Sequence, residues 1–334
     1  MKAVTTSSLS PLEVSAKEVP VPTPKAGQLL VRVDAAPINP SDQYFMAGAY
    51  NPAQIPPTPY TVGFEGAGTV VEVGEGVEKE RWINKKLAFI HPGTWTEYIV
   101  FAETYPMKVV MSDKINPVDV ASFWINPMTV MNMYDIARKA GVTAVAHNAG
   151  ASSLGRQLIR LGLKKGFDVV NVVRREAQVE ALHAIGAKYV VNMSKDGWQK
   201  EWHDITHKLG VTILFDAIGG DVAGEFLAQM PNKSTLYNYG ALSGKPLAGF
   251  TANDFIFTQK TVTGLWLTSW LPSLKPLDLK DYAGTVAEDL NTGGAIFGSK
   301  VAKTFPLEQF KEAVEYANAH TLDGKVYFTP SQKS

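Results

Sequence analysis

Two adjacent arginines, Arg174 and Arg175, directly follow the apolar segment 168–173. A guanidinium group can bind a phosphate through two parallel hydrogen bonds, so such a pair could hold a phosphorylated ligand. A turn of small residues at 148–155 precedes this segment. Small residues let backbone N–H groups approach an anion, and a helix that begins there points its positive end at the same anion. Together the two features predict a site for a phosphate-rich ligand.

The residues on either side of the turn predict a strand, a helix and a second strand. Segments 142–147 and 168–173 are apolar runs, and leucines recur on one face of the helix between them. This order is typical of a dinucleotide-binding unit, whose usual G-x-G-x-x-G turn is reduced here to Gly150-x-Ser152-x-x-Gly155. An ordinary strand–turn–helix connection is the alternative. From this turn, cofactor contacts are expected for Asn148, Gly150, Ala151, Ser152, Ser153 and Leu154.

The end of the second strand indicates which dinucleotide binds. A site for NAD usually has an Asp or Glu there, which holds the ribose 2′-OH. This chain has Asn171, Arg174 and Arg175 instead, and guanidinium groups can bind the additional 2′-phosphate of NADP. We therefore expect NADP(H) rather than NAD(H), with Arg174 and Arg175 as phosphate ligands. Two solvated arginines at the start of the next helix are the alternative.

The composition argues against several classes of function. The 334 residues carry 32 basic and 32 acidic side chains, so no net charge favours nucleic acid. No apolar run is long enough to predict a membrane span, and the N-terminal residues resemble neither a signal peptide nor a transit segment, which suggests the cytoplasm. The chain has no cysteine, which excludes disulfides, thiolate nucleophiles and Cys-ligated zinc. His203 and His207 have metal-ligand spacing, but the Glu of an H-E-x-x-H site is missing, so a solvated helix face is expected.

Hydrophobic periodicity divides the chain into two domains. Residues 1–120 contain alternating segments such as 28–34 and 69–73 between proline-rich loops, which predicts a β-barrel-like domain. Residues 121–267 alternate strands and helices, which predicts a doubly wound parallel sheet of the Rossmann type, and residues 268–334 are expected to complete the first domain. The fold class is thus α/β. The strands expected in the parallel sheet are 143–148, 168–173, 188–192, 211–216, 234–239 and 262–267.

Residues Gly63–Val70 have the pattern G-x-E-x-x-G-x-V. With the turn described above, this segment resembles the medium-chain dehydrogenase/reductases, and the resemblance covers essentially the whole chain. It implies a GroES-like catalytic domain beside the Rossmann domain. Zinc alcohol dehydrogenases of this family have a Cys in the loop that reads 38–42 here, and a His where this chain has Phe64. The resemblance is therefore to the zinc-free branch of quinone reductases and 2-enoyl thioester reductases, and no metal ligand is expected.

Two segments favour the enoyl reductases within that branch. Residues 264–270 are similar to their G-F-W-L-x-x-W segment, and residues 171–175 are similar to their N-V-V-R strand end. Bacterial quinone reductases tend to hold the 2′-phosphate with a Lys and a Tyr, where this chain has Gln178 and Met193. By the same resemblance the cofactor meets Trp266 and Leu267, although a buried or dimer-forming edge strand explains the tryptophan segment equally well.

The resemblance also implies catalytic residues. Tyr50 matches a loop tyrosine of both subfamilies, and its phenol is expected to donate a hydrogen bond to the substrate carbonyl as hydride reaches the β-carbon. A loop tyrosine with a solvated hydroxyl is the alternative, and Tyr44 is the second candidate. Asn39 and Asp42 are expected to shape the same pocket, although Asn-Pro-Ser-Asp also suits a turn or helix cap. Further cofactor contacts are implied for Thr129, Tyr239, Ala241, Leu242 and Lys325.

These expectations describe a metal-independent oxidoreductase that uses NADPH to reduce the conjugated C=C bond of a 2-enoyl thioester or enone. An NADPH:quinone oxidoreductase is the first alternative, and a cofactor-binding protein without a catalytic role is the second. The expected partners are a small conjugated carbonyl compound or quinone, and a second copy of the chain paired through strand 262–267.

Overall fold

The computed structural model describes residues 1–331, and the chain forms two compact units. The β-rich unit contains Met1–Pro127 and Asp281–Ser334, and the parallel-sheet unit contains Met128–Lys280. The helices α4 (Ile125–Ala140) and α11 (Pro276–Asn291) each contain one of the two boundaries. The boundaries expected from the sequence, after residues 120 and 267, lie before these helices.

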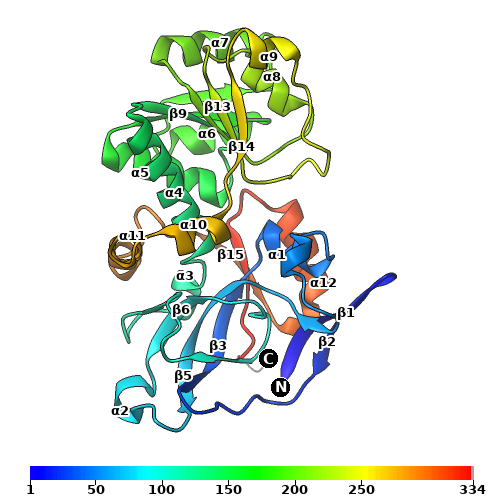
Figure 1. Ribbon diagram of the computed structural model, residues 1–334, viewed down its shortest axis with the longest axis vertical. Helices are drawn as coiled ribbons and strands as arrows, with labels where there is room; N and C mark the ends of the chain where they lie inside the picture. The colour runs from blue at the N-terminus through cyan, green and yellow to red at the C-terminus, as the bar shows by residue number, and fades with distance from the viewer. Residues whose placement is uncertain (332–334) are drawn as a thin grey trace. The chain divides into compact units, whose positions relative to one another are not determined.

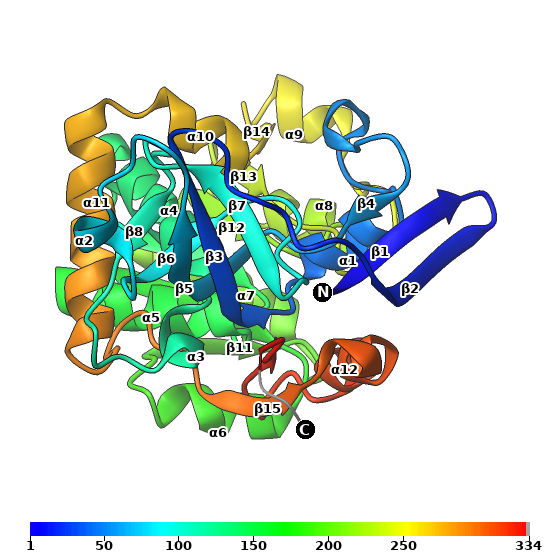
Figure 2. The same cartoon turned by 90° about the horizontal axis from the view of Figure 1, so that it is seen from below.

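Two sheets form the β-rich unit. One has the strand order β2–β1–β4, and the larger one has the order β15–β16–β3–β5–β6–β8, with β7 paired to β3. Leu29, Val31 and Val33 of β3 are fully buried in the core, as their alternation predicts. Figure 2 shows the hairpin of β1 and β2 extending away from the other strands of this unit. The strands are β1 (Lys2–Leu9), β2 (Leu12–Glu18), β3 (Gln28–Pro37), β4 (Tyr60–Thr61), β5 (Glu65–Val73), β6 (Lys86–Ile90), β7 (Tyr98–Ala102), β8 (Lys108–Val110), β15 (Val301–Phe305) and β16 (Lys325–Phe328).

Short helices connect these strands. Helix α1 begins directly after Asn39, whose backbone N–H donates to the Asp42 carboxylate at 2.7 Å. This bond uses the Asn-Pro-Ser-Asp sequence as a helix cap. Besides α11, the helices of this unit are α1 (Pro40–Met46), α2 (Lys79–Trp82), α3 (Pro117–Val120) and α12 (Phe310–Ala319), with single 3₁₀ turns η1 (Pro52–Gln54) and η2 (Leu307–Gln309).

A six-stranded sheet forms the centre of the parallel-sheet unit. Every neighbouring pair is parallel, in the order β11–β10–β9–β12–β13–β14. This is the Rossmann strand order, with its reversal between β9 and β12, where such sheets bind ligands beyond their carboxyl ends. The predicted α/β fold class is therefore confirmed. The strands are β9 (Ala144–Asn148), β10 (Asp168–Val173), β11 (Tyr189–Asn192), β12 (Ile213–Asp216), β13 (Thr235–Asn238) and β14 (Thr261–Gly264).

The helices of this unit alternate with its strands (Figure 1). Helix α5 buries Leu154, Leu158 and Leu161, the three leucines that its periodicity places on one face. Trp202 of α7 is fully buried, and its indole N–H donates to the Phe226 carbonyl at 3.0 Å. Beyond the shared α4, the helices are α5 (Ser153–Lys165), α6 (Glu176–His183), α7 (Trp198–Leu209), α8 (Val222–Ala228), α9 (Ala252–Ile256) and α10 (Leu267–Ser273).

The prediction of a strand at 262–267 is only partly correct. Strand β14 ends at Gly264, and the Trp266 carbonyl accepts from the backbone N–H groups of Ser269 and Trp270, both at 3.1 Å. These bonds open helix α10 at Leu267, so the second half of the segment is helical rather than extended. The sequence analysis also did not predict α9 and α11, although α11 buries Ala283, Val286 and Leu290 at helical spacing.

Candidate cofactor and active site

The turn between β9 and α5 leaves no room for side chains at its two glycines. A Cβ added to Gly150 would lie 2.8 Å from the Cβ of Asn171, and one added to Gly155 would lie 2.4 Å from the Gly150 carbonyl oxygen. Helix α5 therefore lies directly against the turn. Close packing of this kind is what the first and last glycines of a dinucleotide-binding turn provide.

The same turn starts α5 with a side-chain cap. The Ser152 hydroxyl accepts from the Gly155 N–H at 3.0 Å, and Ala149 adopts a positive φ of 65° that lets the backbone reverse. The residues expected at the cofactor from sequence, Ala151, Ser152, Ser153 and Leu154, thus form the turn and the first residues of α5. Helix α5 spans 13 residues and begins at this turn. Because the N-terminus is the positive end of a helix dipole, that end is directed at the turn.

Strand β10 ends beside this turn, since the Gly150 N–H donates to the Val172 carbonyl at 3.1 Å. Arg174 and Arg175 follow the strand and are exposed. Within residues 1–331 neither guanidinium has an acidic partner. Both are therefore available to an anionic ligand.

The other residues at this strand end have structural contacts. Asn171 is fully buried, and its amide donates to the backbone carbonyls of Val169 and Tyr189 at 3.0 and 3.3 Å. The Gln178 side chain accepts from the Arg174 N–H at 3.0 Å, and the Met193 N–H donates to the Val173 carbonyl at 2.9 Å. Gln178 and Met193 thus lie at the end of β10, where the resemblance to quinone reductases suggested a Lys and a Tyr.

A buried carboxylate, Asp216, holds the ends of three strands together. It accepts from the Asn148 amide at the end of β9, and from the Asn238 amide at the end of β13 at 2.8 Å. It also accepts from the Ile218 and Gly219 N–H groups at 3.0 and 3.1 Å. Asn148, expected to contact the cofactor, also accepts from the Ala217 N–H at 2.7 Å, so both ends of its amide have protein partners.

The loop after β13 is bonded to the loop after β12. Leu242 N–H donates to the Ala217 carbonyl at 3.0 Å, while the side chains of Ala241 and Leu242 are exposed. The Tyr239 hydroxyl lies 2.6 Å from His147 Nε2. His147 is fully buried, and burial lowers the pKa of its imidazole to about 3, so the ring is neutral.

The remaining expected cofactor residues of this unit lie on helices. Thr129 is buried in the first half of α4. Trp266 is the N-cap of α10 and is partly buried, and Leu267 is the first residue of that helix and is buried.

In the β-rich unit, Tyr50 packs against an aromatic cluster. Its ring centroid lies 5.2 Å from that of Phe64, which lies 4.7 Å from Phe45, and Phe45 lies 4.9 Å from Tyr60. The Tyr60 hydroxyl donates to the Phe45 carbonyl at 2.7 Å. Tyr50 therefore borders Phe64, the residue that replaces the histidine of zinc enzymes.

Asn39 belongs to a buried polar cluster of four side chains. Its amide donates to Glu65 at 3.0 Å, and its oxygen accepts from the Lys325 ammonium. The second Glu65 oxygen accepts from the Trp124 and Ile125 N–H groups at 2.9 and 2.8 Å, at the start of α4. The fourth member is Asp42, and all four side chains are at most 6% exposed. They include Lys325, which was expected at the cofactor.

Burial dominates the electrostatics of this cluster. It raises the pKa of the Asp42 carboxyl to about 7 and also raises the pKa of Glu65, whereas it lowers the pKa of the Lys325 ammonium. The attraction between Lys325 and the two carboxylates opposes these shifts. With a pKa of about 7, Asp42 changes its charge near neutral pH.

The residues do not fit a zinc site. The chain has no cysteine, and Phe64 places a packed ring where a zinc enzyme has an imidazole. Within residues 1–331, no group of three or more His, Cys, Asp or Glu side chains lies together in a way that could hold a metal ion. His203 and His207 stack on the exposed face of α7 with ring centroids 3.9 Å apart. No helix in the described part of the chain is long and apolar enough to cross a membrane.

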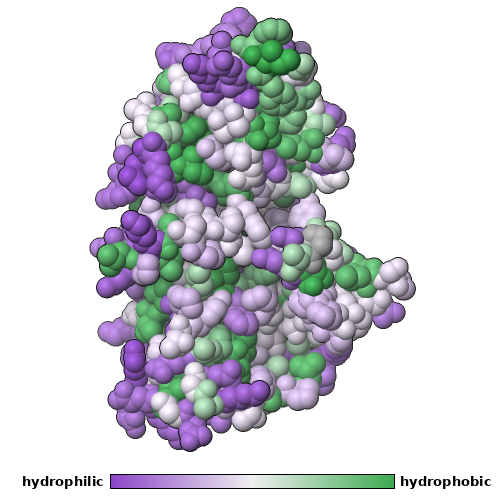
Figure 3. All heavy atoms as spheres, viewed as in Figure 1, coloured by the Kyte–Doolittle hydropathy of each residue, from purple (hydrophilic) through white to green (hydrophobic). Residues whose placement is uncertain are grey.

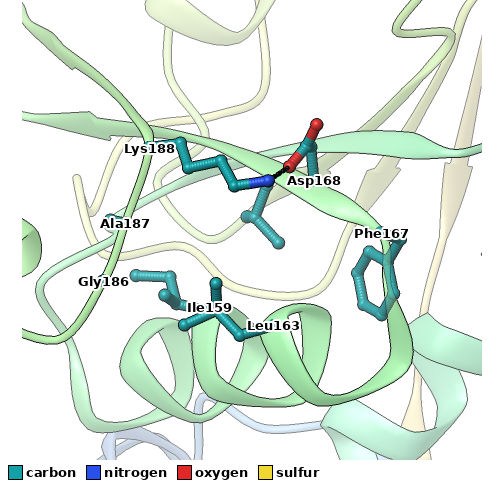
Figure 4. Close-up of a pocket in the computed structure, with 8 residues that line it drawn as sticks. Ile159, Leu163, Phe167, Asp168, Gly186, Ala187 and Lys188 are labelled. Atoms are coloured by element: carbon teal, nitrogen blue, oxygen red, sulfur yellow. Dashed lines mark hydrogen bonds and ion pairs between the residues drawn. The ribbon is translucent and has the colours of Figure 1, made fainter.

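A small cavity lies at the other end of β10. Figure 4 shows it between Ile159 and Leu163 of α5 and the ion pair of Asp168 with Lys188, which are 2.9 Å apart. Its volume of about 10 Å³ is at most that of one water molecule, so it cannot hold a nucleotide.

Sequence reasoning missed the buried carboxylates. Asp216 ends an otherwise apolar strand, and Glu65 begins a strand and is followed by three small residues, Gly66, Ala67 and Gly68, which is an available signal. Charged side chains are rarely buried without partners, so an Asp or Glu in such a segment predicts a polar network. The identity of its partners cannot be found that way, because they lie far away in the sequence.

The sequence is similar to known families and proteins that are consistent with this fold and site. Residues 25–110 match the family model of the alcohol dehydrogenase GroES-like domain, and residues 153–283 match that of zinc-binding dehydrogenases. The chain is 30% identical to the mitochondrial enoyl-[acyl-carrier-protein] reductase of Arabidopsis thaliana, over 88% of this chain and 78% of that protein. It is 25% identical to a 2-haloacrylate reductase of a Burkholderia species, over 94% of each.

Solved structures share the fold. The quinone oxidoreductase of Escherichia coli, complexed with NADPH, superimposes with a TM-score of 0.82 at 18% identity, over 99% of this chain and 100% of that one. A Mesorhizobium loti protein provisionally named NADPH:quinone reductase gives a TM-score of 0.84 at 27% identity, over 99% and 98%. The chain therefore belongs to the medium-chain dehydrogenase/reductase superfamily, in its zinc-free branch.

Proposed function

We propose that this protein is an NADPH-dependent oxidoreductase that reduces a conjugated C=C bond, with a 2-enoyl thioester or an enone as acceptor. The observation that carries the proposal is the end of β10, where two exposed guanidinium groups, Arg174 and Arg175, have no acidic partner within residues 1–331. The names of two relatives, an enoyl-[acyl-carrier-protein] reductase and a 2-haloacrylate reductase, describe reduction of an unsaturated acyl compound. They support the choice of acceptor.

The residues around the turn fit NADP(H). The close packing at Gly150 and Gly155 keeps side chains away from the turn, so backbone N–H groups can approach a pyrophosphate. Arg174 and Arg175 would hold the 2′-phosphate. When bound, the cofactor supplies a hydride. The exposed loop residues Ala241 and Leu242, which the Asp216 network holds in place, would border its nicotinamide half. Thr129, Trp266, Leu267 and Lys325 stay predictions as cofactor contacts.

Tyr50 is the proposed hydrogen-bond donor to the acceptor. When hydride reaches the β-carbon, negative charge accumulates on the carbonyl oxygen. A neutral phenol aimed at that oxygen stabilises the charge and can supply the proton that completes the reduction. The packing of Tyr50 against Phe64 supports this role, since the ring contact orients the phenol. Asn39 is proposed as a positioning residue, because Glu65 and Lys325 hold its side chain.

A panel of acceptors tests the function. Purified protein is mixed with NADPH or NADH and with a crotonyl-type thioester, an enone or a quinone, and loss of reduced cofactor is followed by its absorbance. We expect turnover with NADPH and the thioester or enone, and a much lower rate with NADH. Turnover with NADH alone, or NADPH binding without turnover of any acceptor, would refute the proposal.

A quinone is the second candidate acceptor. The structural relatives from Escherichia coli and Mesorhizobium loti carry quinone reductase names, which favours it. The position of Gln178 and Met193 at the phosphate-binding strand end argues against it, because bacterial quinone reductases tend to have a Lys and a Tyr there. Rates with the quinone that exceed those with thioester and enone would establish this alternative.

We also propose a homodimer formed through the edge of the parallel sheet. Among the described strands β14 is the last of the sheet, and three of its four residues are exposed. Nearby in sequence, α9 and the next residue expose Phe255, Ile256 and Phe257 by 44%, 65% and 76%, and Figure 3 shows this hydrophobic patch. An open strand edge next to apolar surface is a common protein-binding surface. Ile256→Asp should convert a dimer to a monomer in analytical ultracentrifugation, and a monomeric wild type would refute the proposal.

The cytoplasmic location stays a prediction.

A further inference from the structure

The two arginines at the end of β10 are followed directly by an acidic residue, Glu176. Glu176 is the first residue of α6, three positions after the last residue of β10, whereas NAD-binding sites hold the ribose 2′-OH with an acidic side chain at the strand end itself. A free carboxylate here would repel a 2′-phosphate and would weaken the effect of Arg174 and Arg175. The segment after β10 thus contains two guanidinium groups, which attract a 2′-phosphate, and one carboxylate, which repels it.

Glu176 is held by two residues from the neighbouring strand and the loop after it. The Lys195 ammonium lies 3.0 Å from one carboxylate oxygen and 3.2 Å from the other, and the Asn192 amide donates to the carboxylate at 2.9 Å. These hydrogen bonds lower the pKa of Glu176, so the carboxylate is ionised and its charge is opposed by the ammonium. In contrast, Arg174 and Arg175 have no such partner within residues 1–331.

Sheet register sets this arrangement. Asn192 is the last residue of β11 and is paired with Val173, the last residue of β10. The Asn192 side chain also accepts from the Ser194 N–H at 3.1 Å, which turns the following residues back toward the strand end. Lys195 therefore reaches Glu176 because two parallel strands end side by side.

We propose that Lys195 and Asn192 are specificity-determining positioning residues, which neutralise and hold Glu176 so that the end of β10 accepts a 2′-phosphorylated dinucleotide and disfavours its unphosphorylated form. This inference rests on the proposed NADP(H) site. Lys195 acts through Glu176, and the phosphate is bound by Arg174 and Arg175.

The expected effect follows from the charges. The four side chains Arg174, Arg175, Glu176 and Lys195 carry a net charge of +2, which falls to +1 in Lys195→Ala. In Lys195→Ala the Glu176 carboxylate loses the ammonium that opposes its charge, so it repels the 2′-phosphate and competes with it for Arg174 and Arg175. At an exposed and screened site we expect this to change the ratio of kcat/KM for NADPH to that for NADH by about tenfold. We expect the KM for NADPH to rise, with kcat unchanged. Asn192→Ala should change the ratio in the same direction by less, and Lys195→Arg should restore it.

A double-mutant cycle with Glu176→Gln tests the indirect role. In the Glu176→Gln background there is no carboxylate to neutralise, so Lys195→Ala should change the ratio by less than about threefold. The affinities of the same four proteins for 2′,5′-ADP and 5′-AMP are measured by calorimetry. The ratio of the two affinities reports the preference for the 2′-phosphate without turnover. Lys188→Ala is the matched control, because Lys188 forms a comparable ion pair with Asp168 at the other end of β10.

The outcomes separate this inference from the proposed function. A loss of tenfold or more that persists in the Glu176→Gln background would mean that Lys195 binds the phosphate directly, and would overturn the inference. An unchanged ratio in Lys195→Ala, in a protein that binds NADPH tightly, would overturn it as well and leave the proposed function intact. If the wild-type protein binds neither NADPH nor 2′,5′-ADP, both fail.

Discussion

The substitution Asp42→Asn should make the protein more stable at neutral and alkaline pH. Asp42 is fully buried, and one of its oxygens accepts from the Asn39 N–H at 2.7 Å. An asparagine can keep this bond through its own side-chain oxygen, and it carries no charge at any pH. The variant therefore removes the net cost of the ionised carboxylate, which is its burial and its repulsion from Glu65, less its attraction to Lys325 and its bond from the Phe64 N–H.

The magnitude follows from the pKa difference. Burial raises the pKa of Asp42 from 3.8 to about 7, and the charge of Glu65 adds to the rise. Because the folded protein binds this proton more tightly than the unfolded chain, the stability from the group is complete below about pH 4 and is lost as the pH rises through about 7. At 1.36 kcal/mol per unit of pKa, the total loss is on the order of 4 kcal/mol.

Urea unfolding from pH 4 to pH 8 measures this effect, with tryptophan fluorescence as the signal. The variant and the wild type should be nearly equal in stability at pH 4. The advantage of the variant should grow with pH and level off above about pH 7. Asp113→Asn, at an exposed carboxyl, is the control, and its effect should not grow in this way. A constant difference for Asp42→Asn across this range, or a wild type that gains on it as the pH rises, would refute the reasoning.

Three further changes test the site. Tyr50→Phe should lower turnover at least about tenfold with the KM for NADPH unchanged, since one hydrogen bond to the charged oxygen is lost, and a loss in Tyr44→Phe instead would assign the role to Tyr44. Gly155→Ala should abolish NADPH binding in fluorescence titrations, because the new Cβ would lie 2.4 Å from a backbone oxygen, whereas Gly284→Ala, in a helix with open space at that position, should bind normally. Asp216→Asn should lower the free energy of unfolding by about 2 kcal/mol or more, because its new NH₂ group would face N–H donors. Wild-type stability of this variant would contradict the inference that Asp216 holds the three strand ends together.

Local sequence patterns determined the elements that surround the cofactor turn. A strand, a turn of small residues and an amphipathic helix each depend on neighbours only a few positions away, so periodicity and residue size identify them. The absence of cysteine and the presence of Phe64 likewise argue against the family's zinc site through residue type alone, because neither a missing thiolate nor a phenyl ring can ligate a metal. The doubly wound parallel sheet was predicted from the alternation of strands and helices, and the family resemblance agreed with it.

Tertiary structure alone decided which polar groups are joined. Lys325 meets Asn39 across 286 positions of sequence, and Asn148 meets Asp216 across 68. The pairing of Lys195 with Glu176 depends on β10 and β11 ending in register. Burial forces such groups to find partners, since an unpaired charge or amide in the core is costly, but sequence periodicity does not indicate which partner is nearest. Residue type therefore determined which groups can donate, accept or carry a charge. The packing of distant segments determined the protonation state and orientation of each group and the partners that it contacts.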